Sequence, residues 1–302
     1  MSAAAAPASP RSGPRLGIAP RGTRVRDLLF QVVLIMALAI AVIALVTLIY
    51  TIIKDGAGQL SSDFFTNFAS SFPRTAGIQA ALTGTLWLMA VCIIFIVPVG
   101  VASAVYLEEY ADRDKWWNRL IEVNIQNLAA VPSIVYGILG LAFLVRGPLS
   151  LGRVVLAGGL TLGLLVLPVV IITGREAIRA VPSSIREGSL ALGATQWQTI
   201  WRQVLPGSVP GIATGVILAL SRAIGETAPL ILIGAPTFIA FNAHNPFTDT
   251  FTALPLQIFS WLTAPQDAFR LKAAGAIIVL FGLLLMMNAV AIWLRNRYES
   301  KW

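Results

Sequence analysis

Six long apolar segments limit the folds that this chain can adopt. They run over residues 28–53, 78–107, 128–145, 154–173, 210–234 and 273–294. About 20 apolar residues in a helix span a hydrocarbon core about 30 Å thick, whereas outer-membrane strands alternate apolar and polar side chains over roughly 10 residues. The segments are long and lack that alternation, so they predict an all-α integral membrane protein with six transmembrane helices.

The composition excludes a soluble fold. The residues AVILMFWYC make up 57% of the chain and charged residues only 12%, against about 25% charged residues in a typical soluble domain. The single cysteine, Cys92, excludes an intrachain disulfide, and the single histidine, His244, disfavours a zinc or haem site. We expect His244 to be a surface residue rather than a ligand.

The basic residues predict how the helices are oriented in the membrane. The chain carries 22 Lys and Arg against 14 Asp and Glu, a net charge of +8. Fifteen of these basic residues lie in the N-terminal segment, the second and fourth loops and the C-terminal segment, and six lie on the opposite side. Basic residues gather on the cytoplasmic side, so both termini are predicted to be cytoplasmic. The positive charge therefore indicates orientation and not nucleic-acid binding.

The chain divides into four predicted parts. We expect a disordered basic cytoplasmic tail over 1–26, the first transmembrane helix with an extracytoplasmic loop over 27–77, a transmembrane domain over 78–297 and a cytoplasmic C-terminus over 298–302. Small residues four apart let helices approach closely, and such pairs occur at Gly159/Gly163 and Gly211/Gly215. They predict ordinary close packing within one bundle.

The loop at residues 174–209 has the pattern of two short helices joined by a turn. Ser184 and Glu187 have the spacing of a capping box, which predicts a helix over 185–192. Gly193 follows that helix as a C-terminal glycine, so it should end the helix and begin the turn.

The second helix of this loop is predicted to be amphipathic. Thr195 with Gln198 repeats the capping pattern. The residues of its apolar stripe recur at helical spacing and are Trp197, Ile200, Trp201, Val204 and Leu205. Pro206 and Pro210 are expected to end it.

Two interpretations of this loop are open. In the first interpretation, the helices lie on the bilayer surface and Glu187 only caps a helix. Alternatively, the loop is a docking element for a cytoplasmic partner, and the turn presents Glu187 and Gly193.

The fifth apolar segment carries charges near its middle. A charge at mid-membrane costs about 2.5–3.5 kcal/mol, so Arg222 should face the bundle interior or a water-filled path. Glu226 lies one turn further on and forms an i, i+4 pair with it. Pro229 removes a backbone hydrogen bond and weakens the helix there. We assign Ser221, Arg222, Glu226 and Thr227 to a candidate substrate path.

A structural salt bridge is the alternative for the same charges. In that case Arg222 and Glu226 only hold the helix against a neighbour. The planar guanidinium of Arg222 nevertheless suits a tetrahedral oxyanion, and Glu226 would keep such a site weak enough to release its cargo.

The loop resembles the EAA loop of ABC-importer permeases. The matching residues are Glu187-Gly-Ser-Leu-Ala-Leu-Gly193 followed by Leu205-Pro206, with departures at Gly188, Ser189 and Gln203. The resemblance implies a coupling loop that seats in a groove of an ATPase subunit. The residues that it assigns to ATPase coupling are Glu187, Gly188, Ser189, Ala191, Leu192, Gly193 and Ala194.

Three further stretches resemble the permeases of bacterial high-affinity phosphate importers. They are Tyr106–Ala111, Val131–Gly137 and Arg222–Pro229. The resemblance implies the type I, MetI-like permease fold and import of inorganic phosphate by alternating access. It also implies four kinds of contact: a homologous second permease subunit, two copies of a cytoplasmic ATPase, an extracytoplasmic phosphate-binding protein and the lipid membrane.

The chain contains no motif for ATP hydrolysis. A phosphate-binding loop ends in Gly-Lys-Ser/Thr, and the lysines here follow Ile53, Asp114, Leu271 and Ser300. We therefore expect no enzymatic activity and no cofactor in this chain, with ATP and Mg²⁺ bound by the partner. Sulfate or molybdate permeases, a stand-alone anion channel or carrier, and a non-transporting scaffold are the alternatives.

Overall fold

The computed structural model describes residues 21–112 and 114–298, and the regular elements in these ranges are all helices apart from one isolated bridge between Val154 and Thr250. The chain divides into two compact units, residues 1–51 and 52–302. The predicted tail lies largely outside the described residues, but the first helix already begins at Arg21. Residues 21–26 therefore belong to that helix and not to a disordered segment.

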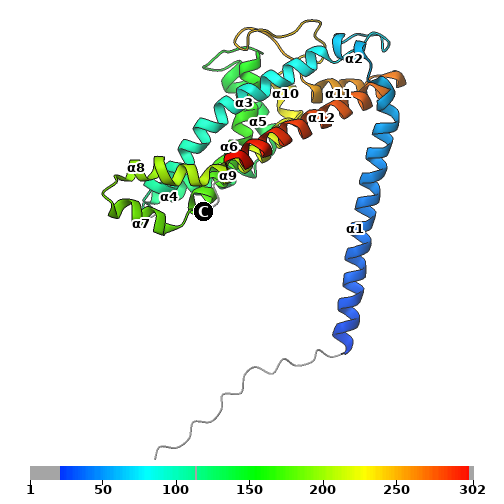
Figure 1. Ribbon diagram of the computed structural model, residues 1–302. Helices are drawn as coiled ribbons and strands as arrows, with labels where there is room; N and C mark the ends of the chain where they lie inside the picture. Colours follow the sequence, from blue (N-terminus) through cyan, green and yellow to red (C-terminus); the bar gives the residue numbers. More distant parts are fainter. Residues whose placement is uncertain (1–20, 113, 299–302) are drawn as a thin grey trace, which may run out of the picture. The chain divides into compact units, whose positions relative to one another are not determined.

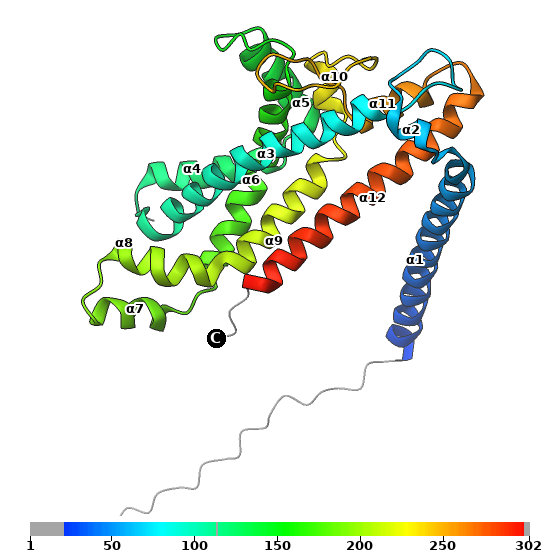
Figure 2. The same cartoon turned by 45° about the horizontal axis from the view of Figure 1, so that its top comes forward.

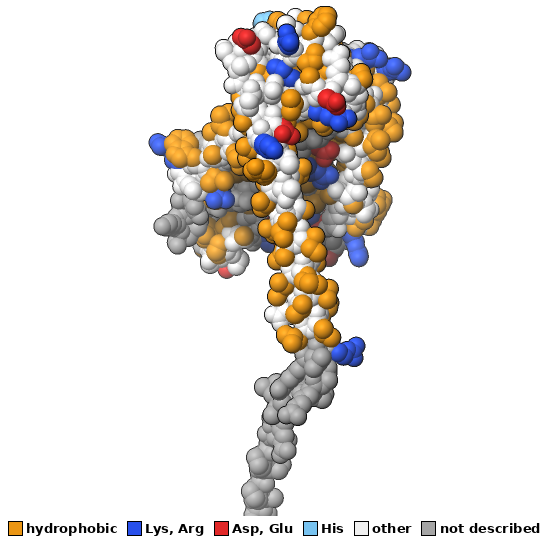
Figure 3. Space-filling model, turned by 90° about the vertical axis from the view of Figure 1, so that its right-hand side faces the viewer, with side chains coloured by type: hydrophobic (Ala, Val, Ile, Leu, Met, Phe, Trp, Pro, Cys, Tyr) orange, Lys and Arg blue, Asp and Glu red, His pale blue; other side chains and the backbone are white. Residues whose placement is uncertain are grey.

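Helix α1 (Arg21–Gly56) supplies all the described structure of the first unit. Its large apolar side chains between Leu28 and Ile53 are exposed around the whole helix, and Figure 3 shows them along its length. A helix that is apolar on every side is typical of a span surrounded by lipid.

The described residues of the second unit form eleven α-helices and four shorter turns. The α-helices are α2 (Ser62–Thr66), α3 (Gln79–Val105), α4 (Trp116–Ala129), α5 (Ser133–Leu139), α6 (Val155–Arg179), α7 (Ser183–Ala191), α8 (Gln196–Thr199), α9 (Leu205–Ala223), α10 (Ala228–Leu232), α11 (Leu254–Leu262) and α12 (Asp267–Tyr298). The turns are the 3₁₀ turn η1 (Ala57–Gln59) and the π-helical turns η2 (Tyr106–Tyr110), η3 (Gly140–Val145) and η4 (Ile200–Val204).

Five helical stretches of the described chain are long and apolar enough to cross a membrane. They are Arg26–Gln59, Gln79–Tyr110, Val155–Arg179, Gln196–Ala223 and Asp267–Arg297. The third predicted span, one continuous helix over 128–145, is wrong. There α4 and the stretch Ser133–Val145 meet at 109°, so a sixth span exists only if this bent pair is counted as one. The bend lies at Pro132, which disfavours helical backbone in the residue before it.

Helix α6 is the centre of the second unit, with α3 on one face and α9 on another. Both predicted glycine pairs lie at these contacts, where a Cβ atom would collide with the neighbouring helix. The close pairs are Gly159–Val91, Gly163–Phe95, Gly211–Ala177 and Gly215–Thr173. The prediction of close packing is confirmed. Figures 1 and 2 show α4, α7 and α8 together at one end of these helices, with α2 and α11 at the opposite end.

Candidate functional site

The first candidate region is the turn between α7 and α8. Helix α7 starts after Pro182, and no side chain caps it, so the predicted capping box of Ser184 and Glu187 is wrong. Ser184 lies inside the first turn, where it cannot act as the cap. The end of the helix follows the prediction: Gly193 has φ +85°, and its N–H donates to the carbonyl of Leu190 at 2.9 Å.

We call α7 the first limb of this turn and α8 with η4 the second limb. The second limb begins as predicted but does not end as predicted. The N–H of Thr195 donates to Gln198 Oε1 at 2.9 Å, and the N–H of Gln198 donates to Thr195 Oγ1 at 3.3 Å, which completes the capping box. Pro206 does not end the helix. In η4 the Leu205 N–H bonds to the carbonyl of Ile200, five residues back, and Pro206 then stands in the first turn of α9, where no N–H is required.

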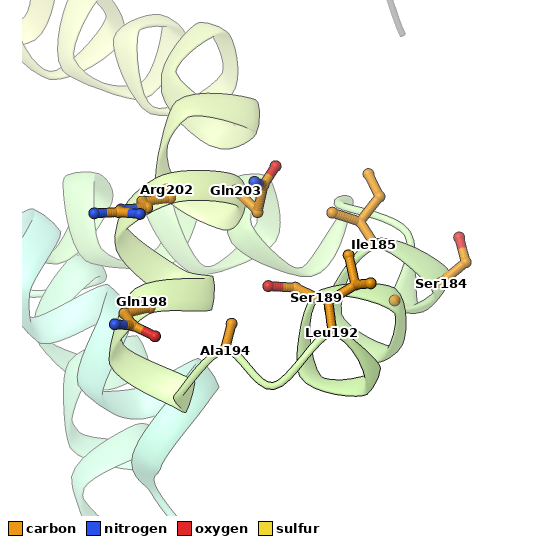
Figure 4. Close-up of a pocket in the computed structure, with 9 residues that line it drawn as sticks. Ser184, Ile185, Ser189, Leu192, Ala194, Gln198, Arg202 and Gln203 are labelled. Atoms are coloured by element: carbon orange, nitrogen blue, oxygen red, sulfur yellow. The ribbon is translucent and has the colours of Figure 1, made fainter.

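A groove of about 400 Å³ separates the two limbs. Figure 4 shows Ser189 of α7 pointing toward the helix that carries Gln198, and the Ser189 and Thr199 hydroxyls lie 2.9 Å apart. Leu192 at the tip of the turn is 91% exposed. The predicted coupling residues that line the groove are Gly188, Ser189, Leu192 and Ala194, while Glu187, Ala191 and Gly193 are exposed on the same turn.

The apolar residues of the second limb include a buried pair and an exposed pair. Ile200 and Val204 are buried, whereas Trp197 and Trp201 are exposed and stack with their ring centroids 5.6 Å apart. The limb is thus anchored by aliphatic residues, and its indole rings stay available for another surface.

The turn η2 at the end of α3 holds an ion network that lies outside both predicted sites. Glu108 has a side chain only 5% exposed, and Arg179 of α6 donates to its carboxylate from Nε and Nη2, both at 3.0 Å. Arg175 Nη2 lies 3.6 Å from the same carboxylate, and Arg175 Nη1 lies 3.0 Å from Glu122 of α4. One carboxylate therefore binds two arginines of α6 to the end of α3.

The neighbouring Glu109 binds the first limb of the turn. Arg186 of α7 donates to Glu109 Oε1 from Nη2 at 2.8 Å and from Nε at 3.1 Å. The same guanidinium donates to the carbonyls of Val181 at 2.6 Å and Ile178 at 2.8 Å, at the end of α6. Gln196 of α8 donates to the backbone carbonyl of Glu109 at 2.7 Å. Both limbs are thus fastened to η2.

The sequence contains a signal for this network. Two acidic residues follow one apolar segment, and Arg175 and Arg179, four residues apart, follow another at the same end of the bundle. The prediction of membrane orientation uses these arginines only as positive charges, and neither predicted site includes Glu108 or Glu109.

The second candidate region is the break after α9. Helix α9 ends at Ala223 and α10 begins at Ala228, with Pro229 in its first turn, so the predicted weak point beside the charges is a real interruption. Arg222 Nε lies 3.4 Å from Glu226 Oε1, which confirms the pair. The side chains are 41% and 20% exposed. A continuous helix over 210–234 is not formed.

The other two predicted path residues have different surroundings. The Ser221 hydroxyl lies 2.7 Å from Asn288 Oδ1, which ties α9 to α12. Thr227 is half-buried, and its carbonyl accepts from Ile231 in α10. The structure therefore brings Arg222 and Glu226 together but uses Ser221 for helix packing.

Two short helices meet beside the break. A Cβ atom at Gly137 of α5 would lie 2.7 Å from Pro229 Cα of α10, so glycine is needed for this approach. The interrupted segments of the third and fifth predicted spans are thus packed against each other. Polar groups at helix interruptions are a common way to build a substrate path.

The loop between α10 and α11 contains a separate carboxylate site. Asp249 Oδ2 accepts the backbone N–H groups of His244 and Asn245 at 2.9 and 3.0 Å, and Thr248 donates to Oδ1. These hydrogen bonds lower the pKa of Asp249 below its ordinary value. The side chain of His244 is exposed, as predicted. The described residues contain no cluster of three His, Cys, Asp or Glu side chains suited to a metal ion.

Comparison with known sequences identifies relatives over most of the chain. Residues 96–300 match the family described as "Binding-protein-dependent transport system inner membrane component". The phosphate transport system permease protein PstA 1 of Mycobacterium tuberculosis is 35% identical over 261 residues, which cover 85% of this chain and 84% of that protein. A probable ABC transporter permease of Bacillus subtilis, YqgI, is 32% identical over 87% of this chain and 92% of its own length.

Solved structures share the fold. A bacterial ABC transporter involved in the import of the acidic polysaccharide alginate aligns with a TM-score of 0.60 and 17% identity, covering 91% of this chain and 97% of that one. The MetNI methionine ABC transporter aligns with a TM-score of 0.59 and 16% identity, covering 76% of this chain and 100% of that one. At these identities the structures establish the fold alone.

Proposed function

The chain belongs to the family of binding-protein-dependent transport system inner membrane components, and we propose that it is the permease subunit of an ATP-driven phosphate importer. It is a multi-pass inner-membrane protein and not an enzyme, and ATP hydrolysis resides in a separate subunit. The observation that carries the phosphate assignment is the similarity to phosphate permeases over most of the chain.

The exposed α7–α8 turn supports ATPase docking. It presents an apolar tip at Leu192 and a carboxylate at Glu187 that makes no hydrogen bond or ion pair with any described residue. A partner subunit would cover these groups. We assign the ATPase contact to Glu187, Leu192 and the groove between the limbs, with the ATPase supplying ATP and Mg²⁺.

The pair at the helix break supports a substrate path. An arginine that faces lipid at this depth would cost about 2.5–3.5 kcal/mol. Because Arg222 is 41% exposed in the isolated chain, its open side is best accounted for by a water-filled path or a second permease subunit. Its guanidinium would then bind the tetrahedral oxyanion, and Glu226 would limit the strength of that binding.

The remaining partners follow from the topology that we propose. With both termini cytoplasmic, the α7–α8 turn faces two ATPase copies, and the loops at residues 54–77 and 236–272 face an extracytoplasmic phosphate-binding protein. A homologous second permease would complete the path. The distribution of basic residues supports this orientation.

Reconstitution tests the function. The chain is purified with its ATPase, second permease and binding protein, placed in vesicles and supplied with labelled phosphate, sulfate or molybdate. We expect ATP-dependent uptake of phosphate alone. Uptake of sulfate or molybdate instead would reassign the substrate, and uptake without the ATPase would indicate a channel or carrier.

Co-purification tests the docking turn separately. Replacing Glu187 and Gly193 together should remove the ATPase from the purified complex, whereas replacing the exposed Asp267 at the other end of the bundle should not. Wild-type protein that purifies alone from cells containing all partners would contradict the assignment.

A further inference from the structure

Helix α7 is held in place mainly by polar contacts. None of its residues is buried, and Ile185 is only partly buried, against a small apolar cluster. So little apolar packing would not fix the orientation of a helix that transmits movement. The contacts that fix its orientation are therefore those of Arg186 and the hydroxyl contact of Ser189 with Thr199.

The Arg186 guanidinium joins three elements at once. It donates to the Glu109 carboxylate in η2 and to the carbonyls of Ile178 and Val181, which end α6 and begin the linker to α7. The carboxylate of Glu109 is 10% exposed, so water competes little for it. Because the guanidinium is planar and its donors are rigidly arranged, α7 cannot rotate without either breaking these bonds or moving η2 with it.

The end of α3 is fastened to α6 by the second carboxylate. Glu108 binds Arg179 and Arg175, and Arg175 also reaches Glu122 of α4. Along their length α3 and α6 are in close contact, through pairs such as Gly159 with Val91. A displacement received at η2 would thus move α3 and α6 together.

The second limb is hydrogen-bonded to η2 by Gln196, through the backbone carbonyl of Glu109, and it also has a covalent route of its own. Helix α8 continues through η4 into α9, which ends beside Arg222 and Glu226. Movement of the docking turn would accordingly reach α9 through α8 and α6 through the short linker before α7, both covalent routes, and would reach α3 through an ionic route between Arg186 of α7 and Glu109 of η2. The ionic route depends on one carboxylate and one guanidinium.

We propose that Glu109 and Arg186 are positioning residues that transmit movement of the ATPase-docking turn into α3, and this rests on the proposed function. The pair does not touch the transported anion and does not bind ATP. Its loss would leave the ATPase bound and active while separating ATP hydrolysis from transport.

The test measures phosphate imported per ATP hydrolysed by the reconstituted complex. Glu109→Gln keeps the shape but removes the charge, and we expect the ratio to fall about 10-fold while the ATPase stays bound and active. Glu109→Asp, which keeps the charge, should restore much of the ratio. Glu176→Gln is the matched control, because Glu176 forms an exposed pair with Arg179 at 3.3 Å beside the same network.

A second variant keeps the outcome decisive. Arg186→Lys retains the charge but loses the planar set of donors, so it should also lower the ratio. A wild-type ratio in both Glu109→Gln and Arg186→Lys overturns the proposal, and so does loss of the ATPase from both, because the pair would then only build the docking turn. If the wild-type complex imports no phosphate, the proposed function fails instead.

Discussion

Among the described residues, the charged side chains at η2 and those at the break after α9 both lie at the ends of apolar helices, and they are built differently. At η2 the carboxylates of Glu108 and Glu109 are nearly buried and receive several arginine hydrogen bonds from α6 and α7. At the break after α9, Arg222 and Glu226 share one contact at 3.4 Å between residues four apart, and both remain partly open.

The difference separates charges that hold helices from charges that remain available. A buried carboxylate that loses its arginine leaves an uncompensated charge, so such a pair is costly to disturb. An exposed i, i+4 pair contributes little to stability. The first arrangement therefore suits a fixed joint, and the second suits a site where an anion replaces one partner temporarily.

The largest expected effect is on phosphate uptake. It tests whether the partly exposed pair of Arg222 and Glu226 binds the transported anion. Arg222→Gln removes the positively charged guanidinium and should reduce phosphate uptake to background, with the complex still assembled. Uptake into vesicles and co-purification of the ATPase provide the two measurements. Lys115→Gln, at an exposed ion pair with Asp112, is the control. Normal uptake by the Arg222 variant would remove this residue from the path.

The next prediction compares how much each set of charges contributes to the free energy of unfolding. Glu108→Gln should lower the free energy of unfolding by about 1–3 kcal/mol, because it removes the nearly buried carboxylate that Arg179 and Arg175 share while each arginine keeps a second, more exposed carboxylate. Glu226→Gln should lower it by less than about 1 kcal/mol. Thermal unfolding of the purified chains measures both, and equal shifts would show that the two sets have the same structural role.

A smaller effect concerns the turn that the buried network supports. Gly193 has φ +85°, so Gly193→Ala should cost about 1–2 kcal/mol of stability in the α7–α8 turn. Gly188→Ala, in helical backbone with no atom near the added Cβ, should be neutral or stabilise α7 by up to about 1 kcal/mol. Thermal unfolding distinguishes them; equal behaviour would mean that the positive φ is not required.

The smallest effect involves a carboxylate held by backbone N–H groups rather than by arginine. The pKa of Asp249 is lowered from 3.8, so its hydrogen bonds stabilise the loop above that pH and are lost as the pH falls through the folded-state pKa. Asp249→Asn should therefore lower hydrogen-exchange protection of the His244 and Asn245 amides at neutral pH. Asp267→Asn, in an exposed pair, should leave those amides unchanged.

The sequence determined the features that depend on neighbouring residues. Long apolar segments require helices in lipid, because every backbone polar group must be satisfied within the segment. Gly193 ends α7, the Thr195 capping box begins α8, and the chain breaks beside Pro229, each for a reason that lies within a few residues.

Only the tertiary structure decided how distant segments meet. Pro206 continues a helix because a π-helical turn precedes it, and Pro132 bends a predicted span by 109°. Glu108 pairs with an arginine 71 residues further along the chain, and Glu109 pairs with one 77 residues further along. Their pairing depends on the close packing of α3 against α6, which places the ends of both helices together. Local hydrogen bonding and hydropathy specify each helix, but the choice of ion partners requires the geometry of the assembled bundle.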